Sequence, residues 1–325
     1  MTAGPALDAR FAGAPWRWLL VAACAALAAT FLYPSLPLQR PQYRLLFVLD
    51  VSQSMNATDR TLRGEPVSRA AFARATLRAA LRELPCGSQA GLGLFTEYRS
   101  FLLLEPVETC ANYGELTATL DRLDYRMGWA GGSEIAKGIF FGLRIAKALY
   151  PPAALVFVTD GHEAPPINPR LRPQFDGDPG AVKGMLVGVG GSALVPIPKF
   201  GLDGKSFGYW GADEVLQTDV YSRGRAGSVS GETMVDSGSA AERPAPGAGE
   251  HLTSLKEPYL QQLASELGLG YHRLESVADL VTAFKAAGLA QEAKGTFDLR
   301  WLLAIAALLV VALMFILQPR PVGLQ

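Results

Sequence analysis

An α/β fold with a doubly wound, mostly parallel sheet is predicted by three observations. Continuous apolar runs at residues 45–49, 154–158 and 185–189 have the length of strands that are buried on both faces. Segments of helical period alternate with these runs, at 67–83 and 133–150. About 265 residues lie between two longer apolar stretches, which is enough chain for one large core.

The segment 133–150 shows the helical pattern most clearly. Its apolar residues fall three or four apart, so that they would share one face toward the sheet. These residues are Ile135, Ile139, Leu143 and Ala146.

The C-terminal part of the core is predicted as a helix at 257–267, an edge strand at 270–274 and a last helix at about 277–287. The sheet is expected to include one antiparallel edge strand. Residues 191–250 are poor in periodic pattern and rich in Gly, Ser and Pro, so a long surface loop is predicted there. The aromatic groups around 196–199 and 209–211 either pack over the sheet edge, which is favoured, or face a partner.

Residues 90–97 and 99–106 predict a hairpin that turns at Tyr98. Residues whose numbers sum to 196 would then face one another, and Cys86 and Cys110 satisfy that sum. A disulfide there would indicate an oxidising compartment. The alternative is two free buried thiols, because cysteine is often a small core residue.

Oxygen-bearing side chains follow the predicted strands. Asp50, Ser52 and Ser54 come at the end of the first run, Ser133 lies between two runs, and Asp160 ends the second run. Hydroxyls with only two carboxylates would hold a hard divalent cation that still attracts a carboxylate from elsewhere. Each segment alone could be a simple turn, and Ser133 could be a helix N-cap.

Together these residues resemble the metal motif of the von Willebrand factor A domain, a Rossmann-like fold. The resemblance implies that Ser52, Ser54 and Ser133 bind the ion directly and that Asp50 and Asp160 act largely through water. Ser133 stands where the family has Thr, which keeps the hydroxyl and loses a methyl group. Mg²⁺ is the favoured ion, with Mn²⁺ or Ca²⁺ as alternatives.

The two apolar stretches, 18–33 and 301–317, are predicted as membrane spans, although each is slightly short of the usual ~20 residues. The first could instead be a cleaved signal or a lipoprotein box ending at Cys24. The predicted organisation is an N-terminal tail at 1–17, a span at 18–36, the A-type domain at 43–290 with its loop at 191–250, a second span at 300–318 and a tail at 319–325.

The candidate catalytic motifs in the sequence are incomplete. Gly204, Lys205 and Ser206 resemble the end of a phosphate-binding loop, but the first glycine that it requires falls at Lys199. Asp50 lacks the second carboxylate of a phosphatase, because Ser52 stands two residues later. The protein is therefore not expected to be an enzyme.

The histidines and a row of arginines are given ordinary roles. His162, His251 and His272 lack metal-ligand spacing, although His162 and Glu163 lie next to Asp160 and could tune the site. A solvated helix face is the favoured role of four arginines, Arg69, Arg74, Arg78 and Arg82.

The order span, A-type domain, span resembles the membrane-anchored A-domain proteins that accompany bacterial methanol dehydrogenase. Further support comes from the segments 86–88, 131–135, 159–166 and 187–191. The resemblance implies an inner-membrane protein whose domain faces the periplasm and helps to mature the enzyme, including calcium insertion. Its partner would be a client protein that supplies a carboxylate, such as methanol dehydrogenase or its other accessory proteins. No nucleic-acid partner is expected.

The similar Bat-type group, linked to oxidative-stress tolerance, is the nearest alternative. A metal-independent membrane scaffold is another. Under the metal-site interpretation, Asp160→Ala or Ser52→Ala should abolish client binding without loss of fold, because both residues are expected at a solvated strand end.

Overall fold

The computed structural model describes residues 15–32, 35–128, 131–167, 172–201, 203–215, 232–234 and 249–317. The chain divides into two compact units. The larger is Pro41–Gln291, and the smaller combines Met1–Arg40 with Glu292–Gln325.

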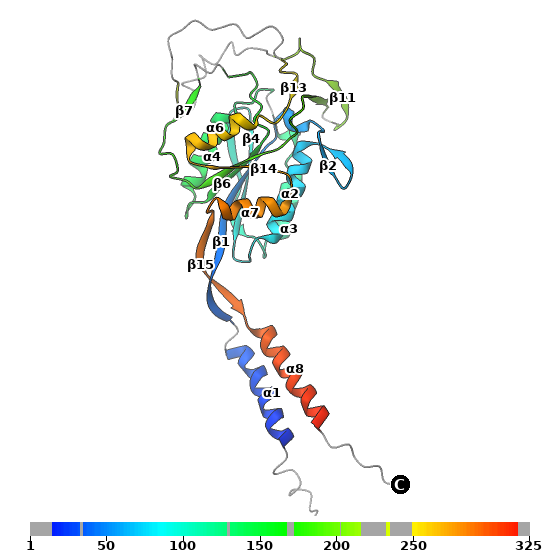
Figure 1. Cartoon of the computed structure of the whole chain (residues 1–325), viewed down its shortest axis with the longest axis vertical. Coiled ribbons are helices and arrows are strands. Elements are labelled where there is room, and N and C mark those ends of the chain that lie inside the picture. Colours follow the sequence, from blue (N-terminus) through cyan, green and yellow to red (C-terminus); the bar gives the residue numbers. More distant parts are fainter. Residues whose placement is uncertain are drawn as a thin grey trace, which may run out of the picture. The chain divides into compact units, whose positions relative to one another are not determined.

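The larger unit is built on a twisted central sheet whose strands follow the order β14-β8-β6-β1-β4-β5 (Figure 1). All neighbouring pairs along this path are parallel except β4 with β5, so β5 forms an antiparallel edge. The doubly wound, mostly parallel sheet with one antiparallel strand is therefore confirmed. The strands are β1 (Ser35–Asp50), β4 (Gln89–Thr96), β5 (Arg99–Glu108), β6 (Ala154–Thr159), β8 (Gly184–Gly188) and β14 (Gly270–Arg273).

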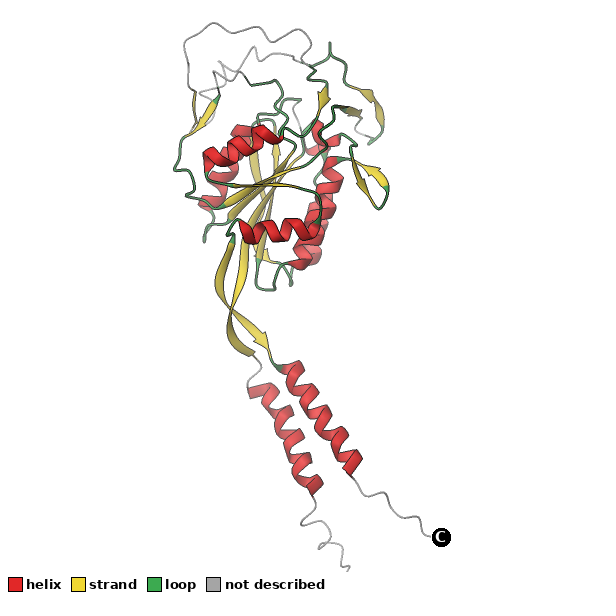
Figure 2. Cartoon of the chain, viewed as in Figure 1, coloured by secondary structure: helices red, strands yellow, loops and turns green. Residues whose placement is uncertain are grey.

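Helices cover both faces of this sheet (Figure 2). One hydrophobic cluster joins it to α2 (Arg69–Glu83), α3 (Tyr113–Arg122) and α7 (Val277–Ala286). A second cluster joins the opposite face to α4 (Ile135–Ala148) and α6 (Glu257–Leu267). Residues of β1 alternate between the two clusters, as strands with two buried faces must.

Most predicted elements of the core are present within one or two residues. The helix predicted at 257–267 is α6, and the one predicted at 277–287 is α7. Helix α3 was not predicted. Its N-cap residue makes no side-chain capping bond, and only Leu116 and Leu120 are buried on its core face.

The hairpin is present, but the constant register predicted for it was wrong. Paired numbers sum to 195 from Thr96↔Arg99 to Gly93↔Leu102, and to 197 at Gln89↔Glu108, with irregularities between. A Cβ atom at Gly93 would lie 2.6 Å from the carbonyl oxygen of Phe101. Missing side chains of this kind let the strands approach closely and change register.

The region predicted as a long surface loop contains short strands among its described residues. They form small two-stranded sheets, none of which joins the central sheet. The pairs are β9 (Val195–Pro196) with β13 (Leu252–Thr253), β10 (Pro198–Phe200) with β11 (Ser206–Tyr209), and β12 (Glu232–Met234) with β7 (Pro173–Phe175). A separate hairpin joins β2 (Arg60–Leu62) to β3 (Glu65–Val67).

The smaller unit contains two helices that pack on each other, α1 (Pro15–Leu32) and α8 (Arg300–Leu317). Strand β15 (Ala290–Asp298) precedes α8 and pairs with β1. Among the described residues, no helix combines the length and the apolar character required of a membrane span. Most of the predicted N-terminal tail, the C-terminal tail and the ends of both predicted spans lie outside the described residues.

Candidate cation site at the ends of β1 and β6

The candidate site lies where the strand order reverses. From β1 the chain continues to β4 on one side, whereas β6 leads to β8 on the other. Because β1 and β6 are parallel neighbours, their terminal residues Asp50 and Asp160 come to the same edge of the sheet. Crevices at such reversal points are the usual ligand sites of open α/β sheets.

The Asp50 carboxylate is fully buried and holds the loop that follows it. Its Oδ1 accepts the backbone N–H of Ser52 at 2.8 Å, and its Oδ2 accepts the hydroxyl of Thr159 at 2.6 Å. The chain then turns into a short 3₁₀ helix, Gln53–Asn56. This turn brings the Oγ atoms of Ser52 and Ser54 to 3.3 Å from each other.

Asp160, directly after β6, forms similar hydrogen bonds to the loops of the site. Its Oδ1 accepts the Ser54 hydroxyl at 3.1 Å and the backbone N–H of His162 at 3.0 Å. Both aspartates thus stand behind the serine hydroxyls and orient them. This is the placement expected of carboxylates that act on a bound ion indirectly.

Ser133 joins the group through a bridge between distant segments. Its backbone pairs with Glu97 on one side and with Ala164 on the other. Helix α4 begins later, at Ile135, with Glu134 as its N-cap residue and no side-chain capping bond. The N-cap alternative for Ser133 was therefore wrong. Its Oγ is buried and has no hydrogen-bond partner among the described residues.

A cavity of about 290 Å³ brings the three serines together. Ser52, Ser54 and Ser133 line it; the first two come from the loop after β1 and the third from a distant segment. Asp50 and Asp160 are not among the residues that line it. The five predicted residues therefore converge, with the hydroxyls toward the cavity and the carboxylates behind.

The electrostatics of the site favour a cation. Burial, and then the nearby charge of Asp160, raises the pKa of Asp50 to about 7. A positive ion nearby would favour the ionised form of Asp50. The unpartnered Ser133 hydroxyl and the paired Ser52 and Ser54 oxygens are ligands that Mg²⁺, Mn²⁺ or Ca²⁺ accept. The residues present therefore fit a divalent cation.

Arg69 is the residue that sequence reasoning placed wrongly. The solvated helix face assigned to it is excluded, because its side chain is fully buried. Its Nη1 lies 2.6 Å from Asp160 Oδ2, and its Nη2 lies 2.6 Å from Asp59 Oδ2. The same Nη1 donates to the hydroxyl of Thr253 at 2.9 Å.

This pairing also corrects the expectation that Asp160 occupies a solvated strand end. The side chain is 0% exposed and carries an ion pair. Its replacement by alanine would remove one of the two carboxylates that pair with the buried Arg69, so the fold would be affected. Nothing in the sequence distinguishes Arg69 from the other three arginines of the row.

His162 is more closely involved than its expected ordinary role suggests. It is 2% exposed and lines the cavity, and neither ring nitrogen has a hydrogen-bond partner among the described residues. Its Nε2 lies 3.6 Å from Glu250 Oε2. Burial lowers the pKa of His162, so the ring is neutral near pH 7. His251 and His272 do not line this cavity.

Glu163 supports the site from the side of α4. Its carboxylate accepts the backbone N–H groups of Ile135 and Ala136 at 2.9 and 3.1 Å, and the hydroxyl of Tyr259 at 2.5 Å. It therefore satisfies the free N–H groups at the start of α4. Burial nevertheless raises the pKa of Glu163 to about 8.

The outer wall of the cavity comes from the region predicted as a loop. Ile197 and Trp210 line it, which agrees with packing for these two residues. Phe207 and Tyr209 on β11 are 70% and 60% exposed. Of the aromatic side chains in this region, Trp210 therefore packs at the cavity, whereas Phe207 and Tyr209 face solvent.

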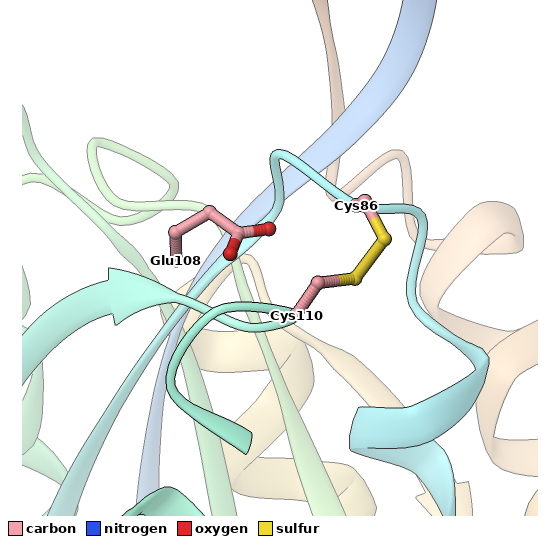
Figure 3. Close-up of side chains that lie close together, drawn as sticks. All are labelled: Cys86, Glu108 and Cys110. Carbon is pink, nitrogen blue, oxygen red and sulfur yellow. A yellow bond between two sulfur atoms is a disulfide. The ribbon is translucent and has the colours of Figure 1, made fainter. Parts of the chain in front are cut away.

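Cys86 and Cys110 form a disulfide at the open end of the β4–β5 hairpin, with Glu108 beside it (Figure 3). Glu108 accepts the backbone N–H groups of Gly87 and Ala111 at 2.7 and 2.6 Å. These three residues are near enough together to share a metal ion. Both sulfur atoms are already bonded, so the cluster is a structural link rather than a metal centre.

Comparisons with known proteins give a family match and several similar solved structures. Residues 45–162 match the von Willebrand factor type A domain. None of the curated proteins compared with the chain matches it. The solved structures similar to it include an aerotolerance-related membrane protein from Bacteroides fragilis, with 16% identity over 75% of this chain and 96% of that one at a TM-score of 0.48.

Two further solved structures are similar to the chain. The BatB protein from Bacteroides thetaiotaomicron has 17% identity over 75% of this chain and 98% of its own, at a TM-score of 0.48. A membrane-spanning protein from Vibrio fischeri has 15% identity over 76% and 98%, at a TM-score of 0.28. The family match at 45–162 includes all five residues of the candidate site.

Proposed function

We propose that this protein is a non-enzymatic accessory protein that binds a client protein through a divalent cation held by Ser52, Ser54 and Ser133. One observation carries the proposal: three buried hydroxyls from two distant segments share one cavity, and that of Ser133 has no hydrogen-bond partner among the described residues. The two carboxylates behind them supply negative charge without filling the cavity.

The client would contribute a carboxylate. Neutral hydroxyls leave a divalent ion short of charged ligands, so an acidic side chain that reaches the cavity completes the coordination. The cation, when bound, supplies the attraction for that acid. The exposed rings of Phe207 and Tyr209 offer apolar contact area nearby on the same sequence region.

The favoured client is a periplasmic dehydrogenase of the methanol-oxidising type, or one of its accessory proteins, on the sequence resemblance described above. In this proposal the two apolar stretches anchor the protein in the inner membrane, and the domain faces the periplasm. The disulfide of Cys86 with Cys110 supports this side of the membrane, because such bonds persist in oxidising compartments. The Bat-type role in stress tolerance is the alternative supported by the same motifs.

The test is affinity capture of the tagged full-length protein from native membranes, in magnesium and in chelator. The variant to compare is Ser133→Ala, because it removes one cation ligand and breaks no hydrogen bond between described residues. Ser265→Ala, an exposed serine on α6, is the matched control. We expect the wild type and Ser265→Ala to retain the client in magnesium, and chelator or Ser133→Ala to release it.

The identity of the captured proteins then separates the clients. A dehydrogenase or its accessory proteins would support the maturation role, whereas other envelope proteins would favour the stress-tolerance role. Capture of the same partners by all variants, with and without chelator, would contradict a metal-mediated contact and favour a scaffold that does not use the site.

A further inference from the structure

The wall of the hydroxyl cavity includes a carboxylate of this chain. Glu250 lines it together with Ser52, Ser54 and Ser133, and its side chain is only 18% exposed. The residue comes at the end of the sequence region that separates β11 from β13. The chain thus delivers an acid to the place where a client's acid is expected.

The segment that carries Glu250 is fastened to Asp160. Strand β13 begins two residues after Glu250 and pairs with β9. Its Thr253 hydroxyl lies 3.4 Å from Asp160 Oδ2, and the backbone N–H of Lys256 donates to the Asp160 carbonyl at 2.9 Å. The segment is thus attached both to the side chain and to the backbone of Asp160. Glu250 is therefore held beside the cavity by the site's own residues.

The imidazole of His162 is a second polar group at this cavity. It lies 3.6 Å from the Glu250 carboxylate and is buried, as is the Ser133 hydroxyl. Both side chains lack a hydrogen-bond partner among the described residues. Two buried polar groups without a partner at one cavity indicate a polar ligand there, since such groups are otherwise costly.

We propose that Glu250 is an internal ligand of the cation site, occupying the coordination position that a client carboxylate must take. This inference rests on the proposed function, because it requires the cation. The direct ligands from the serines are neutral, and a charged oxygen from the chain itself would complete them. A client carboxylate would then bind by displacing Glu250. Carboxylates that bind the cation only weakly would be excluded.

The test uses the full-length protein in detergent micelles with Mn²⁺ as the probe and acetate as a small carboxylate. Free Mn²⁺ is followed by electron paramagnetic resonance during titration, with and without acetate. The variant is Glu250→Gln, which keeps the shape and removes the charge. Glu275→Gln is the matched control, because Glu275 is 63% exposed and does not line the cavity.

Without acetate, we expect Glu250→Gln to bind Mn²⁺ about tenfold more weakly than the wild type, as for loss of a charged ligand or its support. Acetate should restore Mn²⁺ binding in Glu250→Gln and change the wild type little, because in the wild type the position is taken. Glu275→Gln should behave as the wild type in both conditions.

Ser133→Ala distinguishes failure of the internal ligand from failure of the cation site itself. If it weakens Mn²⁺ binding while Glu250→Gln binds Mn²⁺ and responds to acetate like the wild type, the internal ligand is refuted and the cation site remains. If the wild type itself binds no Mn²⁺, or binds it independently of Ser133, the proposed function is refuted and the internal ligand with it.

Discussion

Replacing Arg69 by methionine should destabilise the fold and make its stability more dependent on magnesium. The guanidinium is fully buried and forms ion pairs of 2.6 Å with both Asp59 and Asp160. Its removal leaves one wholly buried carboxylate and one nearly buried carboxylate without a counter-charge. Breaking a buried pair from one side costs about 3 to 5 kcal/mol of unfolding free energy.

The magnesium dependence follows from the shared partner. Arg69 and the proposed cation both compensate Asp160, and they repel each other. Charges several ångströms apart interact by about 1 to 3 kcal/mol at the effective dielectric of a protein site. The stabilisation by Mg²⁺ should therefore be larger in Arg69→Met than in the wild type by about that amount.

Chemical denaturation of the full-length protein in micelles, in chelator and in saturating Mg²⁺, measures both effects. Arg82→Met is the matched control, since Arg82 is exposed on the same helix and the change should stay within about 0.5 kcal/mol. An Arg69→Met variant whose loss of stability is the same in Mg²⁺ and in chelator would refute the idea that arginine and cation share Asp160.

Three further predictions concern the supports of the site. The folded protein retains the Glu163 proton between pH 4.5 and about 8, where the unfolded chain releases it, so stability should fall with rising pH across that window by at most about 1.4 kcal/mol per unit. Denaturation at several pH values should show this slope in the wild type and its loss in Glu163→Gln; equal slopes would contradict it. Loss of the Cys86–Cys110 bond, which spans 24 residues, should lower the unfolding free energy by about 3.5 kcal/mol on the chain-entropy model. A Cys86→Ser/Cys110→Ser variant with an unchanged denaturation midpoint would count against this. Gly138→Ala should destabilise α4 packing by about 1 to 3 kcal/mol although alanine favours helix, because its Cβ would lie 2.1 Å from the Phe95 ring; a rise in melting temperature would show that the ring can move away.

The core could be predicted from sequence because its strands are buried on both faces. The runs at 45–49, 154–158 and 185–189 have no polar interruption, and this pattern occurs in few other structures. The juxtaposition of Asp50 and Asp160 follows from parallel pairing of β1 with β6. Both inferences depend on short-range patterns and on general rules of sheet topology.

What could not be predicted depends on contacts between distant residues. Arg69 resembles its exposed neighbours on the helix, and only the folded chain reveals that Asp59 and Asp160 enclose it. The shift of pairing in the β4–β5 hairpin arises from the close approach of the strands at Gly93. Counting residues from the turn cannot reveal such a shift. Glu250 reaches the cavity through the pairing of β13 with β9, two strands of two residues each that carry no detectable pattern.

The central claim is that Ser52, Ser54 and Ser133 hold a divalent cation, and anomalous diffraction from crystals grown with Mn²⁺ tests it most directly. We predict an anomalous peak at about 2.2 Å from the hydroxyl oxygens of these serines, absent in Ser133→Ala, with the Asp50 and Asp160 carboxylates farther away. Ordered Mn²⁺ found only elsewhere, with the three hydroxyls bound to water or protein groups instead, would contradict the account.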